Sequence, residues 1–359
     1  MARLARGKTI NPAEIQILHC IQRCVRRAFL CGKDTATGQS FDHRRGWIQN
    51  RLEFLASAFG IDCLTYTVLS NHAHIVLRSR PDVVASWSDK EVAQRWLRLY
   101  PKRRDKNGDP EEPNEPEMNM IVNNPDRLAE LRRRLSDISW WMRCLAEYIA
   151  RRSNAEDNCS GRFWQGRYRG ENLLDEAALL ACAMYVDLNP IRAAMAETPE
   201  TSQFTGAKDR IDDLAARNDR SRLSDHDWQR AGAGQQSGWL SPIGIDERKD
   251  ELGPDVDTAG RRASRRGFLS ISLTDYLELL DWTGRAIRAG RRGSIPAHLA
   301  PILTRIGVND QHWYEVVTRF GKLFKRAAGS AENLAAEARR RGVRWLQGPG
   351  ARLLSTASG

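Results

Sequence analysis

The sequence predicts an α+β fold, and the prediction rests on the order of elements in its first eighty residues. Apolar residues recur at helical spacing in FDHRRGWIQNRLEFLASAF before Gly60 ends that helix. IDCLTYTVLS and HAHIVLRS are short apolar runs divided by Ser70 and Asn71, as expected of two strands. The predicted order is a strand beginning near residue 15, a helix over 41–59, and strands over 61–70 and 72–79.

The rest of the chain is divided by changes in composition. Residues 101–125 are polar and rich in Pro and Asn, which predicts a loop insertion. A helical pattern resumes before GRFWQGRYRGENLL, which reads as one or two short strands, and Asp175 can cap the helix that follows. We therefore expect a first domain over 1–197, a charged linker over 198–262 and a mostly helical accessory domain over 263–359.

Composition favours an anionic partner. The 359 residues carry a formal charge of +11, mainly from arginine, which binds phosphates and stacks on bases. The seven cysteines include no CxxC pair, so buried reduced thiols are expected. No stretch approaches the roughly 20 apolar residues of a membrane span. We expect a cytoplasmic protein that binds nucleic acid and no membrane.

Two histidines provide the first chemical signal. His72 and His74 lie two apart in a predicted strand, so both imidazoles point to the same face and can hold a metal ion. In the helix that begins at Asp175, Tyr185 and Asn189 are four apart and share a face beside small residues. Alternative interpretations are that Tyr185 is a core residue and that Asn189 only ends the helix before Pro190.

Taken together, these segments resemble a known family. LSNHAHIVLR is similar to the histidine-hydrophobic-histidine strand of the HUH endonucleases. GRFWQGRYRGENLLDEAALLACAMYVDLNPIRAAM resembles the tyrosine-helix region of their single-tyrosine transposases, most closely the REP-associated branch. Both motifs occur in the expected order, and the resemblance covers about residues 10–197. Ala73 departs from the bulky apolar residue usual between the histidines.

The resemblance implies a fold and a reaction. The fold is a ferredoxin-like antiparallel sheet with helices on one face, and the reaction is cleavage and rejoining of single-stranded hairpin or repeat DNA in transposition or recombination. Tyr185 would be the nucleophile, forming a 5′-phosphotyrosine bond. His72, His74 and Asn189 would hold Mg²⁺ or Mn²⁺ at the scissile phosphate. Asp187 is a weaker candidate ligand, and the protein would act as a monomer or homodimer.

Aromatic and basic residues alternate just before the tyrosine helix. Aromatic rings stack on bases while arginines contact phosphates, so this segment is the first candidate for DNA contact, although its aromatic residues can also be core. Tyr168 is the second candidate nucleophile. The predicted DNA-binding residues are Arg162, Trp164, Arg167, Tyr168, Arg169 and, in the tyrosine helix, Arg192.

Two other functions stay open from the sequence. One is a hairpin-binding protein that has lost cleavage, and the other is a replication initiator or relaxase of the HUH superfamily. The LNP sequence after Tyr185 favours the transposase interpretation. We further expect the C-terminal unit to add DNA affinity, so that a chain ending near residue 200 keeps cleavage but binds long DNA less tightly.

Overall fold

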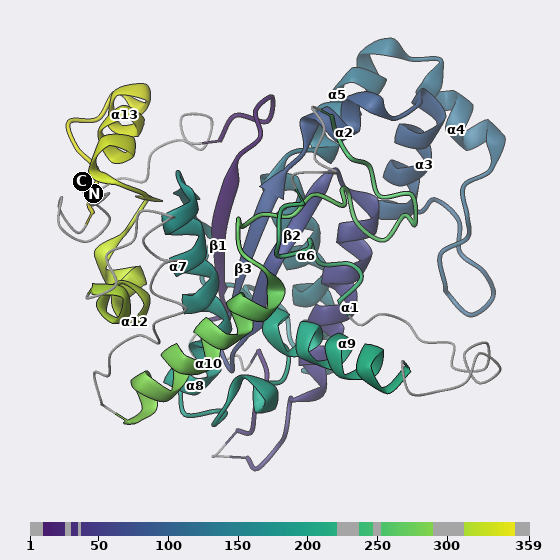
Figure 1. The fold of residues 1–359 in the computed structure, drawn as a ribbon. Coiled ribbons are helices and arrows are strands. Elements are labelled where there is room, and N and C mark those ends of the chain that lie inside the picture. Colours follow the sequence, from purple (N-terminus) through teal and green to yellow (C-terminus); the bar gives the residue numbers. More distant parts are fainter. Residues whose placement is uncertain are drawn as a thin grey trace.

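The computed structural model describes residues 10–25, 30–34, 37–220, 237–246, 253–289 and 312–348. It is an α+β structure around a five-stranded mixed sheet of order β2-β3-β1-β4-β5 (Figure 1). Neighbouring strands among the first four are antiparallel, and β5 pairs in parallel with β4. The strands are β1 Ile17–Arg23, β2 Ile61–Val68, β3 His72–Ser79, β4 Arg169–Leu173 and β5 Ala327–Ala328.

Helices connect and cover these strands. Those before β4 are α1 His43–Ala58, α2 Pro81–Ser86, α3 Asp89–Leu99, α4 Glu115–Val122, α5 Pro125–Leu135 and α6 Ile138–Glu156. Those after β4 are α7 Glu176–Asp187, α8 Asn189–Arg192, a 3₁₀ turn Pro199–Thr201, α9 Gly206–Arg220, α10 Leu273–Ala289, α12 Trp313–Leu323 and α13 Ala331–Arg341. The predicted loop insertion at 101–125 is therefore partly helical, because α4 begins inside it with Asn114 as its cap.

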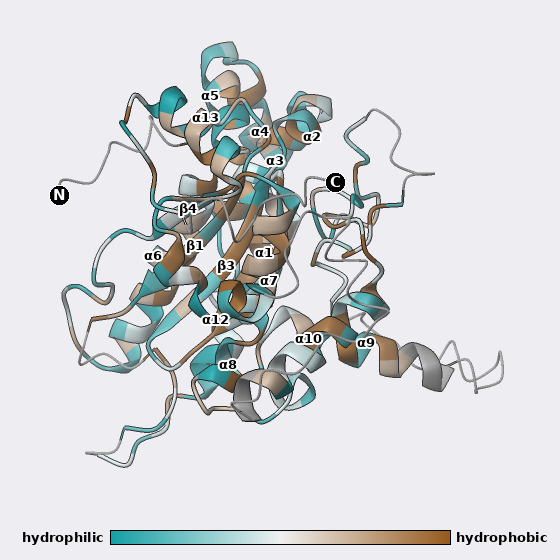
Figure 2. Ribbon diagram, turned by 60° about the vertical axis from the view of Figure 1, so that its left-hand side comes forward, coloured by the Kyte–Doolittle hydropathy of each residue, from teal (hydrophilic) through white to brown (hydrophobic). Residues whose placement is uncertain are grey.

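The sheet is covered on both faces, which corrects the expectation of helices on one face. Successive strand residues point to opposite sides, so Leu18 packs in the core under α1 and α6 while His19 contacts Phe320 of α12 on the other side. Helices α7, α10 and α12 share the second core. Hydrophobic residues run along the strands and the helices packed on them (Figure 2). The candidate histidines lie on the α7 and α12 side.

The described parts of residues 198–262 are packed on the sheet, so the prediction of a linker is wrong for them. Trp239 is fully buried against Tyr66 of β2, with ring centroids 5.2 Å apart. The backbone N–H of Ser241 donates to the carbonyl of Cys63 at 2.9 Å. The sequence suggested a linker because charged and turn-forming residues are frequent there, whereas the structure buries Trp239, Leu240 and Ile243.

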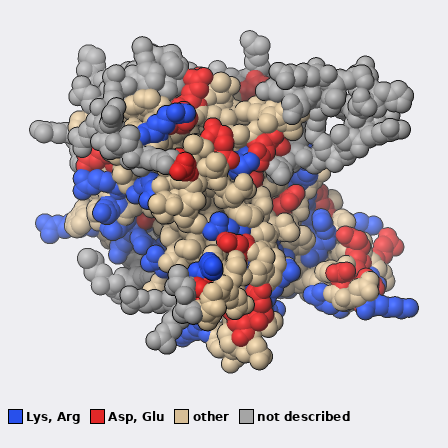
Figure 3. Space-filling view, turned by 90° about the horizontal axis from the view of Figure 1, so that it is seen from below, with Lys and Arg blue, Asp and Glu red and all other residues tan. Residues whose placement is uncertain are grey.

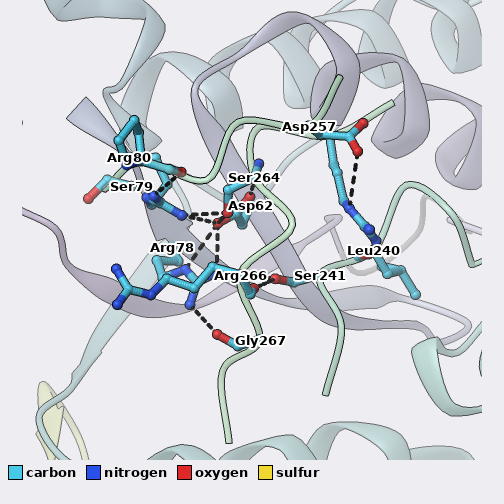
Figure 4. A network of polar contacts seen from close by, with 12 residues as sticks. Asp62, Arg78, Ser79, Arg80, Leu240, Ser241, Asp257, Ser264, Arg266 and Gly267 are labelled. Carbon is cyan, nitrogen blue, oxygen red and sulfur yellow. Dashed lines mark hydrogen bonds and ion pairs between the residues drawn. The ribbon is translucent and has the colours of Figure 1, made fainter. Parts of the chain in front are cut away.

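A buried carboxylate, that of Asp62, holds residues 264–267 to the edge of the sheet (Figure 4). Asp62 of β2 accepts hydrogen bonds from Arg78 at 2.8 Å and from the backbone N–H of Ser264 at 2.9 Å, and it forms an ion pair with Arg80. Arg78 also donates to the carbonyl of Gly267 at 2.8 Å. Buried charges are tolerated when they are paired in this way, so the network clamps residues 264–267 against β2 and β3.

The described C-terminal residues also belong to the sheet rather than to a separate accessory domain. Strand β5 extends the sheet beyond β4, and α12 packs on α7. Asp175, the predicted cap of α7, accepts from the backbone N–H of Ala178 at 2.9 Å and from that of Ser330, just before α13, at 2.6 Å. One side chain thus caps α7 and anchors the C-terminal segment, and the prediction of an independent helical unit over 263–359 is wrong for the described part.

Candidate active site

A cleft of about 800 Å³ opens where β1, β3 and β4 meet α7 and α12. It brings together residues that the sequence predicted from three separate segments. The predicted residues that line it are His72, His74, Arg167, Arg169, Tyr185 and Arg192. The histidine strand and the tyrosine helix therefore meet at one cavity.

The two strand histidines and the tyrosine are neighbours in this cleft. The ring centroids of His72 and His74 are 4.8 Å apart, and those of His74 and Tyr185 are 5.6 Å apart. Strand alternation puts both imidazoles on the face that α7 covers, as predicted. His74 is buried, whereas His72 lies at the end of β3 and is partly exposed.

His74 is the end of a buried chain of hydrogen bonds. Glu171 of β4 lies 3.1 Å from His19 Nδ1, and His19 Nε2 lies 2.8 Å from His74 Nδ1. A carboxylate only accepts, so His19 donates through Nδ1, and a neutral His19 ring then accepts at Nε2 from His74 Nδ1–H. This leaves His74 Nε2 with a lone pair, and that buried atom has no hydrogen-bond partner among the described residues.

His72 also has its hydrogen on Nδ1 and its lone pair on Nε2, but a different partner fixes this tautomer. Its Nδ1 lies 2.5 Å from the side-chain oxygen of Asn71, so Nδ1 carries the hydrogen and Nε2 has the lone pair. Burial and the nearby Arg23 lower the pKa of His72 to about 4. Burial, followed by His19 and His72, also lowers the pKa of His74 well below its usual value. Both imidazoles are therefore neutral near pH 7, as metal ligands must be.

The surroundings of Tyr185 fix its ring and leave its hydroxyl in the cleft. Arg192 places its guanidinium carbon 4.7 Å from the ring centroid. Arg192 itself donates to the carbonyl of Thr318 in α12 at 2.6 Å. A Cβ added at Gly321 would lie 3.3 Å from the tyrosine hydroxyl oxygen, so this glycine allows α12 to approach closely. Helix α12 thus positions the tyrosine and its stacked arginine.

The sequence did not indicate Arg23 or Glu171, and it placed the basic residues of α12, Arg319 and Lys322, in a DNA-binding accessory unit rather than in this cleft. Arg23 of β1 and both Arg319 and Lys322 of α12 add positive charge to the lining, while Glu171 is the one acidic side chain among the described residues that line it. Lys and Arg gather toward the left in the view from below, the side on which Figure 1 shows α12 (Figure 3). The basic pattern of α12 was visible in the sequence, but nothing local indicated that α12 packs beside Tyr185. His19 was visible only as one residue of a predicted strand.

Four predicted residues do not line this cleft. Asn189 is buried at the start of α8, and its Nδ2 has no partner among the described residues. Tyr168 is buried on the α6 side, where its hydroxyl lies 3.0 Å from that of Ser139, and Trp164 donates to the carbonyl of Ala146 at 2.7 Å. Arg162 is exposed elsewhere. The structure thus separates Tyr168 from the histidines and removes the geometric basis for it as a nucleophile.

Asp187 also points away from the cleft. It is fully buried and accepts hydrogen bonds from Thr65 at 2.6 Å and from Tyr276 at 2.5 Å. Burial raises the pKa of its carboxyl. This agrees with the expectation that a residue two positions from Tyr185 projects to another side of the helix.

His72 and His74 can supply two ligands to a metal ion, which is fewer than a complete coordination shell requires. His72 and His74 each present an Nε2 lone pair, and the orphaned Nε2 of His74 is the observation that favours a ligand there. Among the residues that the structure describes, no group of three or more His, Cys, Asp or Glu side chains is arranged to hold an ion. Magnesium commonly keeps waters and substrate phosphate oxygens in its remaining positions, so two protein ligands are compatible with a substrate-bound ion.

Comparison with protein-family models, with curated proteins and with solved structures gives no match in any of the three.

Within the described part of the chain, no helix has both the length and the apolar character needed to cross a membrane. In the residues that the structure describes, which include all seven cysteines, there is no disulfide, and six of the cysteines are buried.

Proposed function

We propose that this protein cleaves and rejoins single-stranded DNA through a covalent bond to Tyr185. The observation that carries the proposal is the meeting of Tyr185, His72 and His74 in one cationic cleft. Four arginines and a lysine there, besides the stacked Arg192, give the site the charge that a phosphate backbone requires. The lining cations are Arg23, Arg167, Arg169, Arg319 and Lys322.

The topology supports the same proposal. The order β2-β3-β1-β4 and the sequence of β1, α1, β2, β3, intervening helices and β4 match a ferredoxin-like arrangement. In the HUH transposases that the sequence resembles, such a sheet carries the histidine motif on a strand and the tyrosine on a following helix. The position of the two histidines on β3 and of Tyr185 on α7 supports the proposal.

The reaction is a phosphodiester exchange. The Tyr185 oxygen attacks phosphorus, the bond from phosphorus to the 3′ oxygen breaks, and the DNA 5′ phosphate becomes joined to the tyrosine. The phenol loses its proton and the departing 3′ oxygen gains one, so the step balances without a nucleotide cofactor. Attack by a 3′-hydroxyl reverses it and joins strands.

This chain's own residues would orient the reacting groups. Arg192 and Gly321 set the position of the tyrosine, and the cleft cations offset the negative charge that builds up on the phosphate. His72 and His74 would hold a divalent ion such as Mg²⁺ or Mn²⁺, which when bound neutralises charge on the scissile phosphate. Asn189 fits less well as a third ligand, because it does not line the cleft.

The test uses the full-length protein and a single-stranded hairpin oligonucleotide labelled at one end. With Mn²⁺ or Mg²⁺, a 3′ label should migrate with the protein on a denaturing gel, and a 5′ label should be released on a fragment that ends in a 3′-hydroxyl. A chelator should prevent both adduct formation and release of the 5′-labelled fragment. The His72→Ala and His74→Ala variants should each have the same effect. Tyr168→Phe is the matched control and should still form the adduct.

Two results would contradict the proposal. Tight hairpin binding without an adduct under any metal condition would indicate a binding protein that does not cut. An adduct that survives Tyr185→Phe would assign the nucleophile to another residue.

A further inference from the structure

A second cavity of about 600 Å³ lies on the α6 side of the sheet. We call it the α6 groove and define it by Trp140, Arg143, Ala146, Ala150, Trp164 and Arg167. It shares Gly166 and Arg167 with the cleft. Arg23 lines the cleft and its neighbour Gln22 lines the groove, because adjacent strand residues point to opposite faces.

A short backbone segment therefore separates the two cavities at the edge of the sheet. The segment is held in place: the Gln22 amide donates to the carbonyl of Gly166 at 3.0 Å, and the backbone N–H of Gln165 donates to the carbonyl of Arg23 at 2.9 Å. Gly166 and Arg167 are both exposed. The cleft and the α6 groove therefore adjoin at Gly166 and Arg167.

The two cavities differ in chemistry. The groove has aromatic and apolar walls, and its two arginines are partly offset by Glu147. Trp164 donates its indole N–H to the carbonyl of Ala146 at 2.7 Å, which fixes the ring. The guanidinium carbons of Arg134 and Arg143 lie 4.2 and 4.9 Å from the ring centroid of Trp140. The cationic lining of the cleft favours phosphates, whereas the aromatic walls of the groove favour flat rings. The negative charge of Glu147 disfavours phosphate in the groove.

We propose that the α6 groove binds unpaired nucleobases of the strand whose phosphates lie in the cleft. The proposal rests on the proposed function for the identity of that strand. Its basis is the continuity of the two cavities at Gly166 and Arg167 and the change from cationic to aromatic lining across them. Stacking against fixed aromatic rings accepts any base, so the groove adds affinity for single strands.

The test compares two probes with the same number of phosphates, a twenty-nucleotide oligothymidine and an abasic strand of equal length. Binding to the full-length protein is measured with chelator present, so the result does not depend on cleavage. The protein should bind oligothymidine at least about 10-fold more tightly than the abasic strand. Oligothymidine should also quench tryptophan fluorescence more than the abasic strand does.

Variants locate the effect in the groove. Ala150→Trp fills the groove, and Arg143→Gln removes an exposed side chain from its rim; each should bring the ratio of the two affinities toward one without changing the affinity for the abasic strand. Arg151→Gln, on the same helix but outside the groove, is the control and should keep the ratio. Arg143→Gln keeps the test valid if Ala150→Trp does not fold.

Equal affinities for the two probes, or a ratio that neither variant changes, would overturn the inference. An apolar peptide as the true occupant would give that result. Loss of the adduct in the cleavage assay with the ratio intact would instead overturn the proposed reaction and leave base binding in place.

Discussion

His19 Nε2 lies 2.8 Å from His74 Nδ1, inside a sheet that buries both rings. Because Glu171 accepts from the other nitrogen of His19, a neutral His19 ring accepts from His74 Nδ1–H, and the His74 lone pair is then on Nε2. Metal-binding histidines commonly donate their second nitrogen to a carboxylate or carbonyl group. Here a second histidine stands between the carboxylate and the candidate ligand.

His19→Phe should weaken Mn²⁺ binding by about 10- to 100-fold, because His74 loses the acceptor that orients it. Titration calorimetry measures the affinity, and nitrogen-15 chemical shifts of the imidazoles report the tautomer of His74 directly. His43→Phe is the control, since His43 also pairs with a carboxylate, Glu156, but lies far from the cleft in the fold. Unchanged affinity and an unchanged tautomer in His19→Phe would show that the relay does not orient His74.

Gly321→Ala should reduce cleavage by roughly 10- to 100-fold while leaving the fold intact. The added Cβ lies 3.3 Å from the Tyr185 hydroxyl oxygen, so the nucleophile must shift by a few tenths of an ångström, and misplacement of reacting groups is costly. Alanine is a better helix former than glycine, so thermal stability should not fall. Gly46→Ala in α1, where the added Cβ meets nothing within 4 Å, should keep full activity.

The double variant Arg319→Gln, Lys322→Gln should bind single-stranded DNA less tightly and reduce the slope of log affinity against log salt by roughly 1.4, because two cations no longer displace counterions. The control removes Lys90 and Arg133, which are exposed on α3 and α5. A salt slope equal to that of the parent protein would place the DNA backbone away from α12.

We expect the free energy of unfolding to change with pH because of Asp209, independently of catalysis. Burial raises the pKa of this carboxyl to about 7, although Tyr66 and Gln49 donate hydrogen bonds to it. The folded chain keeps a proton that the unfolded chain loses near pH 4, so the free energy of unfolding should fall as pH rises from about 4 to about 7. Asp209→Asn should flatten this decrease in urea unfolding, whereas Asp126→Asn, which changes an exposed carboxyl at the start of α5, should not.

The sequence predicted the local elements of the site but not the long-range contacts. Strand alternation correctly placed His72 and His74 on one face, and helical spacing correctly turned Asp187 away from Tyr185. The His19 and Glu171 pair was not predictable, because it joins residues 152 positions apart that carry no shared motif. Only the antiparallel register of β1 and β4 brings them opposite each other.

The C-terminal half was misread for a related physical reason. Residues 198–262 are rich in charged and turn-forming residues, and composition alone does not reveal that Trp239 is buried beside β2. Strand β5 is two residues long, too short to show a periodic pattern. With α12 forming one wall of the cleft, a chain that ends near residue 200 lacks part of the candidate site, so the earlier expectation that it keeps cleavage does not hold for this architecture.

Peptide mapping of the covalent adduct by tandem mass spectrometry tests directly whether Tyr185 is the nucleophile. Full-length protein is incubated with Mn²⁺ and a single-stranded hairpin, then digested with nuclease and protease. We predict one modified peptide, with a nucleotide phosphate on the Tyr185 oxygen, and its complete loss in Tyr185→Phe. A nucleotide phosphate found on Tyr168 or on any other residue, or no modified peptide under conditions where the DNA is cut, would contradict this prediction.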